Sequence, residues 1–194
     1  MLFVRAPLLG VGKRRLAAEA GDVAAVRFER AMLGLLARRL GRDRRWRLRL
    51  VVAPDRSVFR RRLWPRAVAI QPQGAGDIGA RMRRALASCP PGPVVLIGAD
   101  IPQVAARHVA DAFRLLGRHD LVFGPAADGG FWLVGARRSP RLPPLFGTVR
   151  WSGPHALGDT LDNLPRRFSV GFAARLEDVD RAEALRRLAP RSGL

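Results

Sequence analysis

Short apolar runs, separated by glycine, proline and amphipathic stretches, organise the whole chain. The clearest run, over residues 93–102, reads PVVLIGADIP. Its four consecutive apolar residues are typical of a strand buried on both faces, as in a parallel sheet. Gly98 ends the run, and Pro102 cannot donate to a sheet ladder. Asp100 is therefore expected just beyond the carboxyl end of a central strand, where open α/β sheets bind their ligands.

The same pattern predicts strands and helices that alternate along the chain. Strands are predicted over residues 2–6, 47–53, 67–70, 120–123, 131–135 and 168–172. Helices are predicted over residues 22–40, 79–87, 104–116, 155–163 and 181–188. Asp22 is expected to cap the longest helix and Gly41 to end it. This alternation predicts βαβ units around a mainly parallel sheet. No repeat or long linker divides the chain, so one domain over residues 1–190 is expected, with a frayed tail over 191–194.

Composition narrows the class of protein. No window reaches ~18 uninterrupted apolar residues, so no membrane span is expected. The apolar start of the chain is too short for a signal peptide, which favours the cytoplasm. Cys89 is the only cysteine and the three histidines are scattered, which excludes an internal disulfide and a cysteine-based zinc site. A monomer or a homodimer is expected.

The formal net charge of +19 is the largest departure from an average composition. Lys13 is the only lysine, so almost all of the positive charge is arginine, as expected of a GC-rich coding sequence. Such a charge attracts anions, including nucleotides. The arginines are spread along the chain rather than gathered in one arm or helix. This spread disfavours a specific nucleic-acid partner.

The loop over residues 7–13, PLLGVGK, is the first candidate binding site. A glycine-containing turn between a strand and a helix can hold an anion with its N–H groups, and Lys13 and Arg15 would suit a diphosphate. It is not a Walker A loop, because Pro7 stands at the first glycine position and Arg14 where Ser or Thr would hold magnesium. The alternative is an ordinary strand-to-helix turn.

Three further acidic positions are candidates, each with a structural alternative. Asp77 lies in a loop whose glycines allow close approach to a flat ligand, and it could equally cap the next helix. Asp128 could share a cleft with Asp100, although Asp-Gly is the strongest short hairpin signal. Asp178 and Asp180 could complete a metal site, although Asp180 could instead cap the last helix. For Asp100 itself, the alternative to a ligand role is an N-cap of the following helix.

Six motifs follow one another in an order that resembles a known family. They read AP-x-x-G-x-x-K-x-R-L, PQGxGDxGxRM, GxDxP, GPAxDGGFxLxG, W-S-x-P and DVD. Together they resemble the bacterial GT-A-fold glycosyltransferase-like family of the selenodomain-associated or arsenosugar-biosynthesis type. The chain is more distantly similar to molybdenum-cofactor guanylyltransferases and phospholactate guanylyltransferases. The sequence departs from the family pattern at Arg5, Arg14, Gly153 and Arg181.

The resemblance implies a three-layer α/β/α sandwich, the nucleotide-diphospho-sugar transferase fold, and assigns roles to matching residues. Nucleotide-binding positions would be Ala6 and Pro7, with Gly10, Lys13 and Arg15 for the phosphates, and Gln73, Gly74, Asp77 and Arg81 for base or ribose. Asp100 would hold Mg²⁺ or Mn²⁺, with Asp178 or Asp180 as the second carboxylate. The acceptor side would include Asp128, Gly129, Gly130, Trp151 and Ser152.

The leading hypothesis is a metal-dependent transferase that uses a nucleoside-diphosphate sugar and a small-molecule acceptor. The metal on Asp100 would neutralise the leaving diphosphate, assisted by Lys13 and Arg15, and Asp128 would orient the acceptor or act as a base. A second hypothesis is a nucleotidyltransferase that releases pyrophosphate from a nucleoside triphosphate. A third, a basic nucleic-acid or anion-binding protein, leaves the acids at strand ends without a role.

Overall fold

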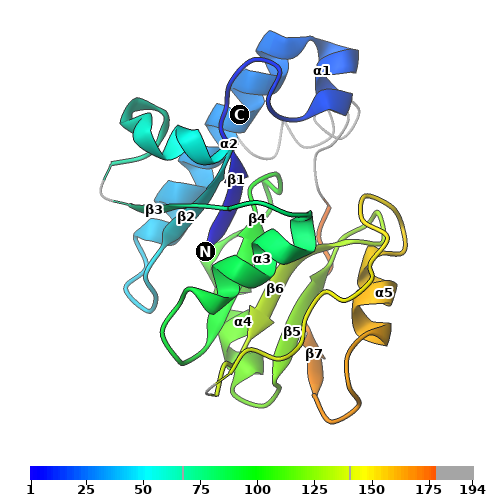
Figure 1. Ribbon diagram of the computed structural model, residues 1–194. Helices are drawn as coiled ribbons and strands as arrows, with labels where there is room; N and C mark the ends of the chain where they lie inside the picture. Colours follow the sequence, from blue (N-terminus) through cyan, green and yellow to red (C-terminus); the bar gives the residue numbers. More distant parts are fainter. Residues whose placement is uncertain (67, 140, 178–194) are drawn as a thin grey trace. The chain divides into compact units, whose positions relative to one another are not determined.

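The computed structural model describes residues 1–66, 68–139 and 141–177. Within them, seven strands form a mainly parallel sheet in the order β3-β2-β1-β4-β6-β5-β7 (Figure 1). The strands are β1 (Leu2–Arg5), β2 (Arg49–Ala53), β3 (Ala69–Pro72), β4 (Val94–Gly98), β5 (Leu121–Pro125), β6 (Phe131–Ala136) and β7 (Val170–Phe172). The predicted α/β class is therefore confirmed.

Helices separate most of these strands, as the periodicity predicts. They are α1 (Arg14–Ala20), α2 (Asp22–Gly41), α3 (Ile78–Ala87), α4 (Ala106–Leu116) and α5 (Ala156–Asp162), with two short 3-10 helices, η1 (Asp55–Phe59) and η2 (Arg61–Leu63). The sequence did not predict α1. The predicted range of α2 is confirmed to within one residue, with Gly41 as its last residue, but the cap prediction was wrong, because Gly21 rather than Asp22 occupies the N-cap position. The predicted helix over residues 181–188 lies outside the described residues.

The chain folds into two compact units. The N-terminal unit comprises residues 2–72 and 98–105 of the described chain, and the C-terminal unit comprises Met1 and residues 73–97 and 106–177. The single-domain expectation stays a prediction. Among the described residues, no helix combines the length and the apolar character needed to cross a bilayer.

The N-terminal unit is built on three parallel strands. Leu2 of β1 is in register with Leu50 of β2, and Arg49 is in register with Ala69 of β3. The middle of β2 is completely buried, which explains why its last residues form a continuous apolar run. Along α2, Phe28, Met32, Leu36 and Leu40 are buried at a spacing of four residues, as the apolar spacing predicts, whereas Ala31, which the same spacing places on this face, is exposed.

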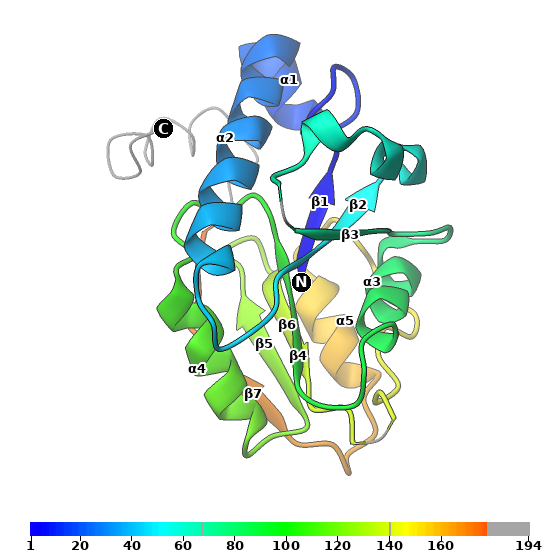
Figure 2. The ribbon, with the colours of Figure 1, turned by 90° about the vertical axis from the view of Figure 1, so that its left-hand side faces the viewer.

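The C-terminal unit combines antiparallel and parallel pairing. Strand β6 runs antiparallel to both β4 and β5, and β7 is parallel to β5. Residues 126–130 join β5 to β6 and are too few for a crossover, so these two strands form a hairpin. Helix α4 covers one face of this part of the sheet, and α3 and α5 cover the other (Figure 2). The three-layer arrangement that the resemblance implied is therefore present in this unit.

The segment after β4 corrects one sequence-based alternative. Helix α4 begins at Ala106, and the Val104 N–H donates to the Ile101 carbonyl in a turn before it. Asp100 lies six positions ahead of the helix and therefore does not cap it, so the N-cap interpretation was wrong. The carboxylate needs another explanation.

Candidate functional site

Lys13 and Asp100 meet in the N-terminal unit. The Lys13 Nζ donates to the Asp100 Oδ2 at 2.7 Å, and the two side chains are 10% and 34% exposed. Lys13 ends the loop between β1 and α1 with a φ of 28°, a left-handed conformation that is uncommon for a residue with a Cβ. The sequence predicted both residues as site members in separate loops, and the fold brings them into direct contact.

Glu29 of α2 belongs to the same group and was missed by sequence reasoning. A methyl group on Gly12 would lie 1.7 Å from the Glu29 Oε1, so this carboxyl packs directly against the loop. Burial raises the pKa of Glu29 to about 7; the cations Lys13 and Arg5 oppose the shift, and Asp100 adds to it. The sequence does carry a signal for this residue. Glu29 stands four residues from Ala25 and four from Leu33, so the helical spacing puts a carboxyl on a buried face of α2.

Replacing Glu29 with glutamine is expected to change how stability depends on pH. The folded protein retains the Glu29 proton up to about pH 7, whereas the unfolded chain loses it near the ordinary value of 4.5. Wild-type stability therefore falls as the pH rises through this window. At pH 8 the free energy of unfolding of the Glu29→Gln variant should exceed that of the wild type by about 1–2 kcal/mol, a figure reduced for the partial exposure of the Glu29 carboxyl.

Urea unfolding at pH 4.5 and pH 8 measures this difference. The matched control is Asp162→Asn, which removes an exposed carboxylate at the end of α5. An equal change of pH dependence in the two variants would contradict the assignment to Glu29.

The loop before Lys13 is held by its own backbone. The Ala6 N–H donates to the Ala53 carbonyl at 2.7 Å, and the Leu8 N–H donates to the Ala6 carbonyl at 2.8 Å. Gly10 follows with a φ of 72°, which favours glycine, while Ala6 and Pro7 are buried. The loop is thus an ordered strand-to-helix turn, and its predicted phosphate contacts stay predictions. Arg15 lies in the first turn of α1 and is exposed.

The loop over residues 73–77 is fixed by arginines of α3 in the C-terminal unit. Arg81 donates to the Gln73 Oε1 and Arg84 to the Gln73 carbonyl, both at 2.8 Å, and Gln73 is 2% exposed. The Asp77 Oδ1 accepts from the Ala80 N–H at 2.7 Å, so the helix-cap alternative is confirmed. Gly74 has a φ of 79°, and a side chain there would overlap the Arg84 guanidinium. Arg84 is a further residue that sequence reasoning missed.

Asp128 forms the turn between β5 and β6. Its Oδ1 accepts from the Gly130 N–H at 2.9 Å, as in an Asx-turn, so the hairpin alternative is confirmed. Ile97 is in register with Leu133, which places this turn at the edge where β4 ends. Gly129 has a φ of 86° and accepts from the Leu157 N–H at 3.2 Å. The exposed Asp128 is therefore presented by a turn that α5 supports.

An aromatic group surrounds Trp151 in the same unit. The ring of Trp151 meets Phe146 edge-on at 5.7 Å and Phe131 at 6.4 Å, and Phe131 stacks on Phe146 at 6.1 Å. A methyl group on Gly79 would lie 2.5 Å from the Trp151 ring, so this glycine permits the close approach. Ser152 follows, exposed, with a φ of 65°. Phe131 and Phe146 extend the predicted acceptor side, and the sequence did not single them out.

Of the three carboxylates predicted to bind the metal, only Asp100 lies among the described residues. Asp178 and Asp180 lie outside them. In the described part of the chain, no three histidine, cysteine, aspartate or glutamate residues gather in a way that could hold a metal ion. Lys13, Asp100 and Glu29 thus form one group in the N-terminal unit. The residues of the 73–82 and 128–152 segments are gathered separately in the C-terminal unit.

More than half of the chain matches a known protein family. Residues 36–153 match a family described as uncharacterized proteins conserved in bacteria, DUF2064. The chain belongs to the DUF2064 family. The matched range includes α3, Asp100 and the hairpin turn, whereas Lys13 and Glu29 lie before it. No protein of curated function matches the sequence.

Solved structures share the fold over nearly the whole chain. A candidate nucleotide-diphospho-sugar transferase from Desulfovibrio desulfuricans G20 is 28% identical, with a TM-score of 0.84 over 98% of this chain and 87% of its own. Rv0371c from Mycobacterium tuberculosis H37Rv is 21% identical, with a TM-score of 0.58 over 97% and 95%. A manganese complex of Rv0371c is also 21% identical, with a TM-score of 0.56 over 96% and 95%. The two Rv0371c structures have the same fold as this chain.

Proposed function

We propose that this DUF2064 protein is a metal-dependent, glycosyltransferase-like transferase that uses a nucleoside-diphosphate sugar. The observation that carries the proposal is the Lys13–Asp100 pair, in which a cation from the first loop meets a carboxylate just past a central strand. The fold shared with the D. desulfuricans transferase candidate supports it.

Asp100 fits the role of one oxygen ligand to a divalent metal. Its carboxylate is a hard oxygen donor, it remains one-third exposed, and it stands next to a loop suited to phosphates. Magnesium and manganese sites of nucleotide enzymes need few protein carboxylates, because substrate phosphates supply further ligands. The manganese complex of Rv0371c supports a divalent metal in this fold. When bound, the metal would neutralise negative charge on the departing diphosphate.

The remaining roles belong to side chains of the chain itself. Lys13, held beside Asp100, would contact the diphosphate and stabilise the charge that develops as it leaves. The half-buried Glu29 would limit the positive charge of this site once it loses its proton, near pH 7. Arg15, exposed on the first turn of α1, would assist in phosphate binding.

The acceptor role is proposed for the C-terminal unit. Asp128 would orient an acceptor hydroxyl from its exposed turn, and Trp151, packed against Phe131 and Phe146, would offer an aromatic face to the acceptor. Gln73 and Arg81 would contact base or ribose, with Gln73 already ordered by Arg81. These roles rest on the family resemblance and on the hydrogen bonds that hold the loop over residues 73–77 and the turn over residues 126–130 in place.

Donor binding measured by calorimetry tests the proposal. UDP- and GDP-sugars should bind only weakly without metal, and at least about tenfold more tightly with Mn²⁺ or Mg²⁺. Transfer should release a nucleoside diphosphate. Binding that metal leaves unchanged would contradict the proposal. Pyrophosphate release from a nucleoside triphosphate would instead favour the nucleotidyltransferase alternative.

A further inference from the structure

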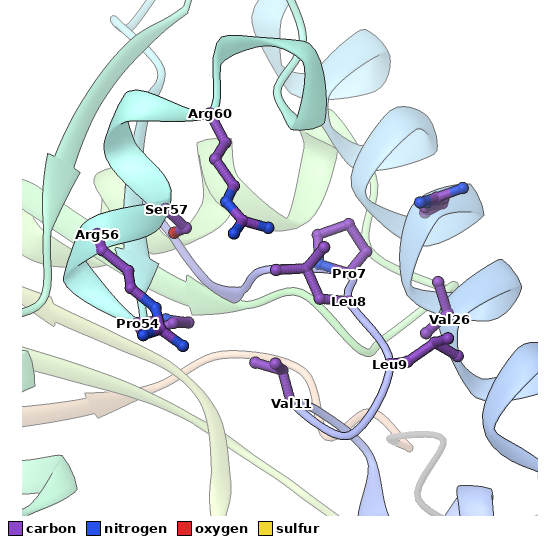
Figure 3. Close-up of a pocket in the computed structure, with 10 residues that line it drawn as sticks. Pro7, Leu8, Leu9, Val11, Val26, Pro54, Arg56, Ser57 and Arg60 are labelled. Carbon is purple, nitrogen blue, oxygen red and sulfur yellow. The ribbon is translucent and has the colours of Figure 1, made fainter.

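A pocket of ≈ 440 Å³ opens in the N-terminal unit, beside the loop that precedes Lys13 (Figure 3). Loop residues 7–11, one side of α2 and residues 54–60 form its walls. Its volume falls in the range of about 300–1,000 Å³ that is typical of small-molecule sites. Neither Lys13 nor Asp100 lines it, whereas Pro7, one of the predicted nucleotide-binding positions, does.

Three arginines line this pocket, and no carboxylate of the described residues does. They are Arg30 of α2, Arg56 of η1 and Arg60 at the end of η1. Arg60 extends toward Pro7 and Leu8 (Figure 3). Within the described chain, none of the three guanidinium groups forms a hydrogen bond or an ion pair. These three exposed guanidinium groups around one concavity attract an oxyanion, which arginine binds in a bidentate manner.

Ser57 gives independent evidence that a polar ligand group belongs in the pocket. Ser57 lines the pocket, is 1% exposed, and its Oγ has no hydrogen-bond partner among the described residues. The backbone around it is fixed, since the Ser57 carbonyl accepts from the Trp64 Nε1 at 2.8 Å. A buried hydroxyl without a partner is uncommon and costs stability. An oxygen of a bound anion would accept a hydrogen bond from the Ser57 hydroxyl and remove this cost.

The remaining wall of the pocket is apolar. Leu8, Val11 and Val26 line it, and Leu9 of the same wall is 65% exposed. Such a wall offers no hydrogen-bond partner to a polar group of the ligand, and it favours contact with a hydrocarbon part of the ligand. The pocket therefore combines an anion-binding side with an apolar side.

We propose that this pocket binds a small organic anion, with a phosphate or carboxylate head on the arginines and Ser57 and an apolar body against the leucine and valine side chains. The proposal goes beyond the transferase function and does not depend on it. Because the pocket and Lys13 share one loop, the ligand would contact the segment that carries the candidate phosphate-binding residues.

Calorimetric titration of the full chain with four probes tests the proposal. Phenyl phosphate or benzoate should bind at least about tenfold more tightly than inorganic phosphate and benzyl alcohol, which lack one half of the recognised chemistry. The tighter of the first two identifies the head group. Arg60→Gln and Ser57→Ala should each weaken binding about fivefold or more. Ser57→Ala should not lower the melting temperature of the ligand-free protein, because it removes a buried hydroxyl that bonds to no described residue.

Two variants serve as controls. Arg62→Gln removes a neighbouring exposed arginine that does not line the pocket, and Asp100→Asn alters the candidate donor site. Both should bind the probe as the wild type does. Equal weakening in Arg62→Gln would overturn the proposal in favour of general charge attraction. Displacement of the probe by UDP or GDP, together with weakening in Asp100→Asn, would overturn it by assigning the pocket to the donor site. Failure of all four probes to bind would also overturn it.

Discussion

The Asp100→Asn variant is expected to lose metal-linked donor binding and to transfer the sugar about 100-fold more slowly or worse. Asparagine keeps the size of the side chain and one oxygen that can accept from Lys13 at the present 2.7 Å contact. It removes the negative charge, and a neutral amide is a poor ligand for a divalent metal. Loss of electrostatic stabilisation of the leaving diphosphate is worth about two to three powers of ten in rate.

Steady-state transfer rates, together with calorimetry in the presence and absence of Mn²⁺, measure the effect. The matched control is Asp111→Asn, which removes a carboxylate that pairs with Arg114 on the surface of α4. This control should retain both activity and stability, since exposed ion pairs contribute little. Asp100 would have no role in metal binding if its variant still bound the donor in a metal-dependent manner with wild-type affinity.

Gly129→Ala should destabilise the C-terminal unit by about 3 kcal/mol or more. Gly129 has a φ of 86°, a region that is unfavourable for alanine. A methyl group there would also lie 2.3 Å from the carbonyl oxygen and 2.6 Å from the Cα of Pro154. No rotamer change relieves a clash with backbone atoms, so either the turn or the segment before α5 must move.

Urea denaturation measures this loss of stability. Gly153→Ala is the matched control from the same region, because nothing lies within 4 Å of a methyl group there. It should change the free energy of unfolding by less than about 0.5 kcal/mol. The close packing of the turn on Pro154 would be refuted if both substitutions had the same small effect.

Movement of this turn also has a functional consequence. The Gly129 carbonyl accepts from the Leu157 N–H, and the Asp128 carboxylate accepts from the Gly130 N–H one residue further on. A displaced turn would therefore change the position of Asp128 relative to Trp151 within this unit. If Asp128 orients the acceptor, Gly129→Ala should raise the acceptor KM even where the protein remains folded.

The sequence alone determined those features that depend on local pattern. Residues 94–97 form a buried strand because four apolar side chains in succession can only be accommodated between two layers. For Asp77 the sequence offered a cap of α3 as one of two alternatives, because an Asp side chain can reach an N–H group three residues away, and the structure confirms this cap. The Asp-Gly pair at residues 128–129 makes a hairpin turn for the same kind of reason. The α/β class follows from the succession of such elements.

Only the tertiary structure decided which distant groups meet. Lys13 and Asp100 are 87 positions apart, and no spacing rule links them. Glu29 has its raised pKa because it is packed against the loop, and desolvation depends on what surrounds a group rather than on its neighbours in sequence. Likewise, the orphaned hydroxyl of Ser57 and the three arginines around it become a site only when α2 and two loops converge. Periodicity fixes the elements, whereas burial and charge at a site arise from contacts between residues far apart in the chain.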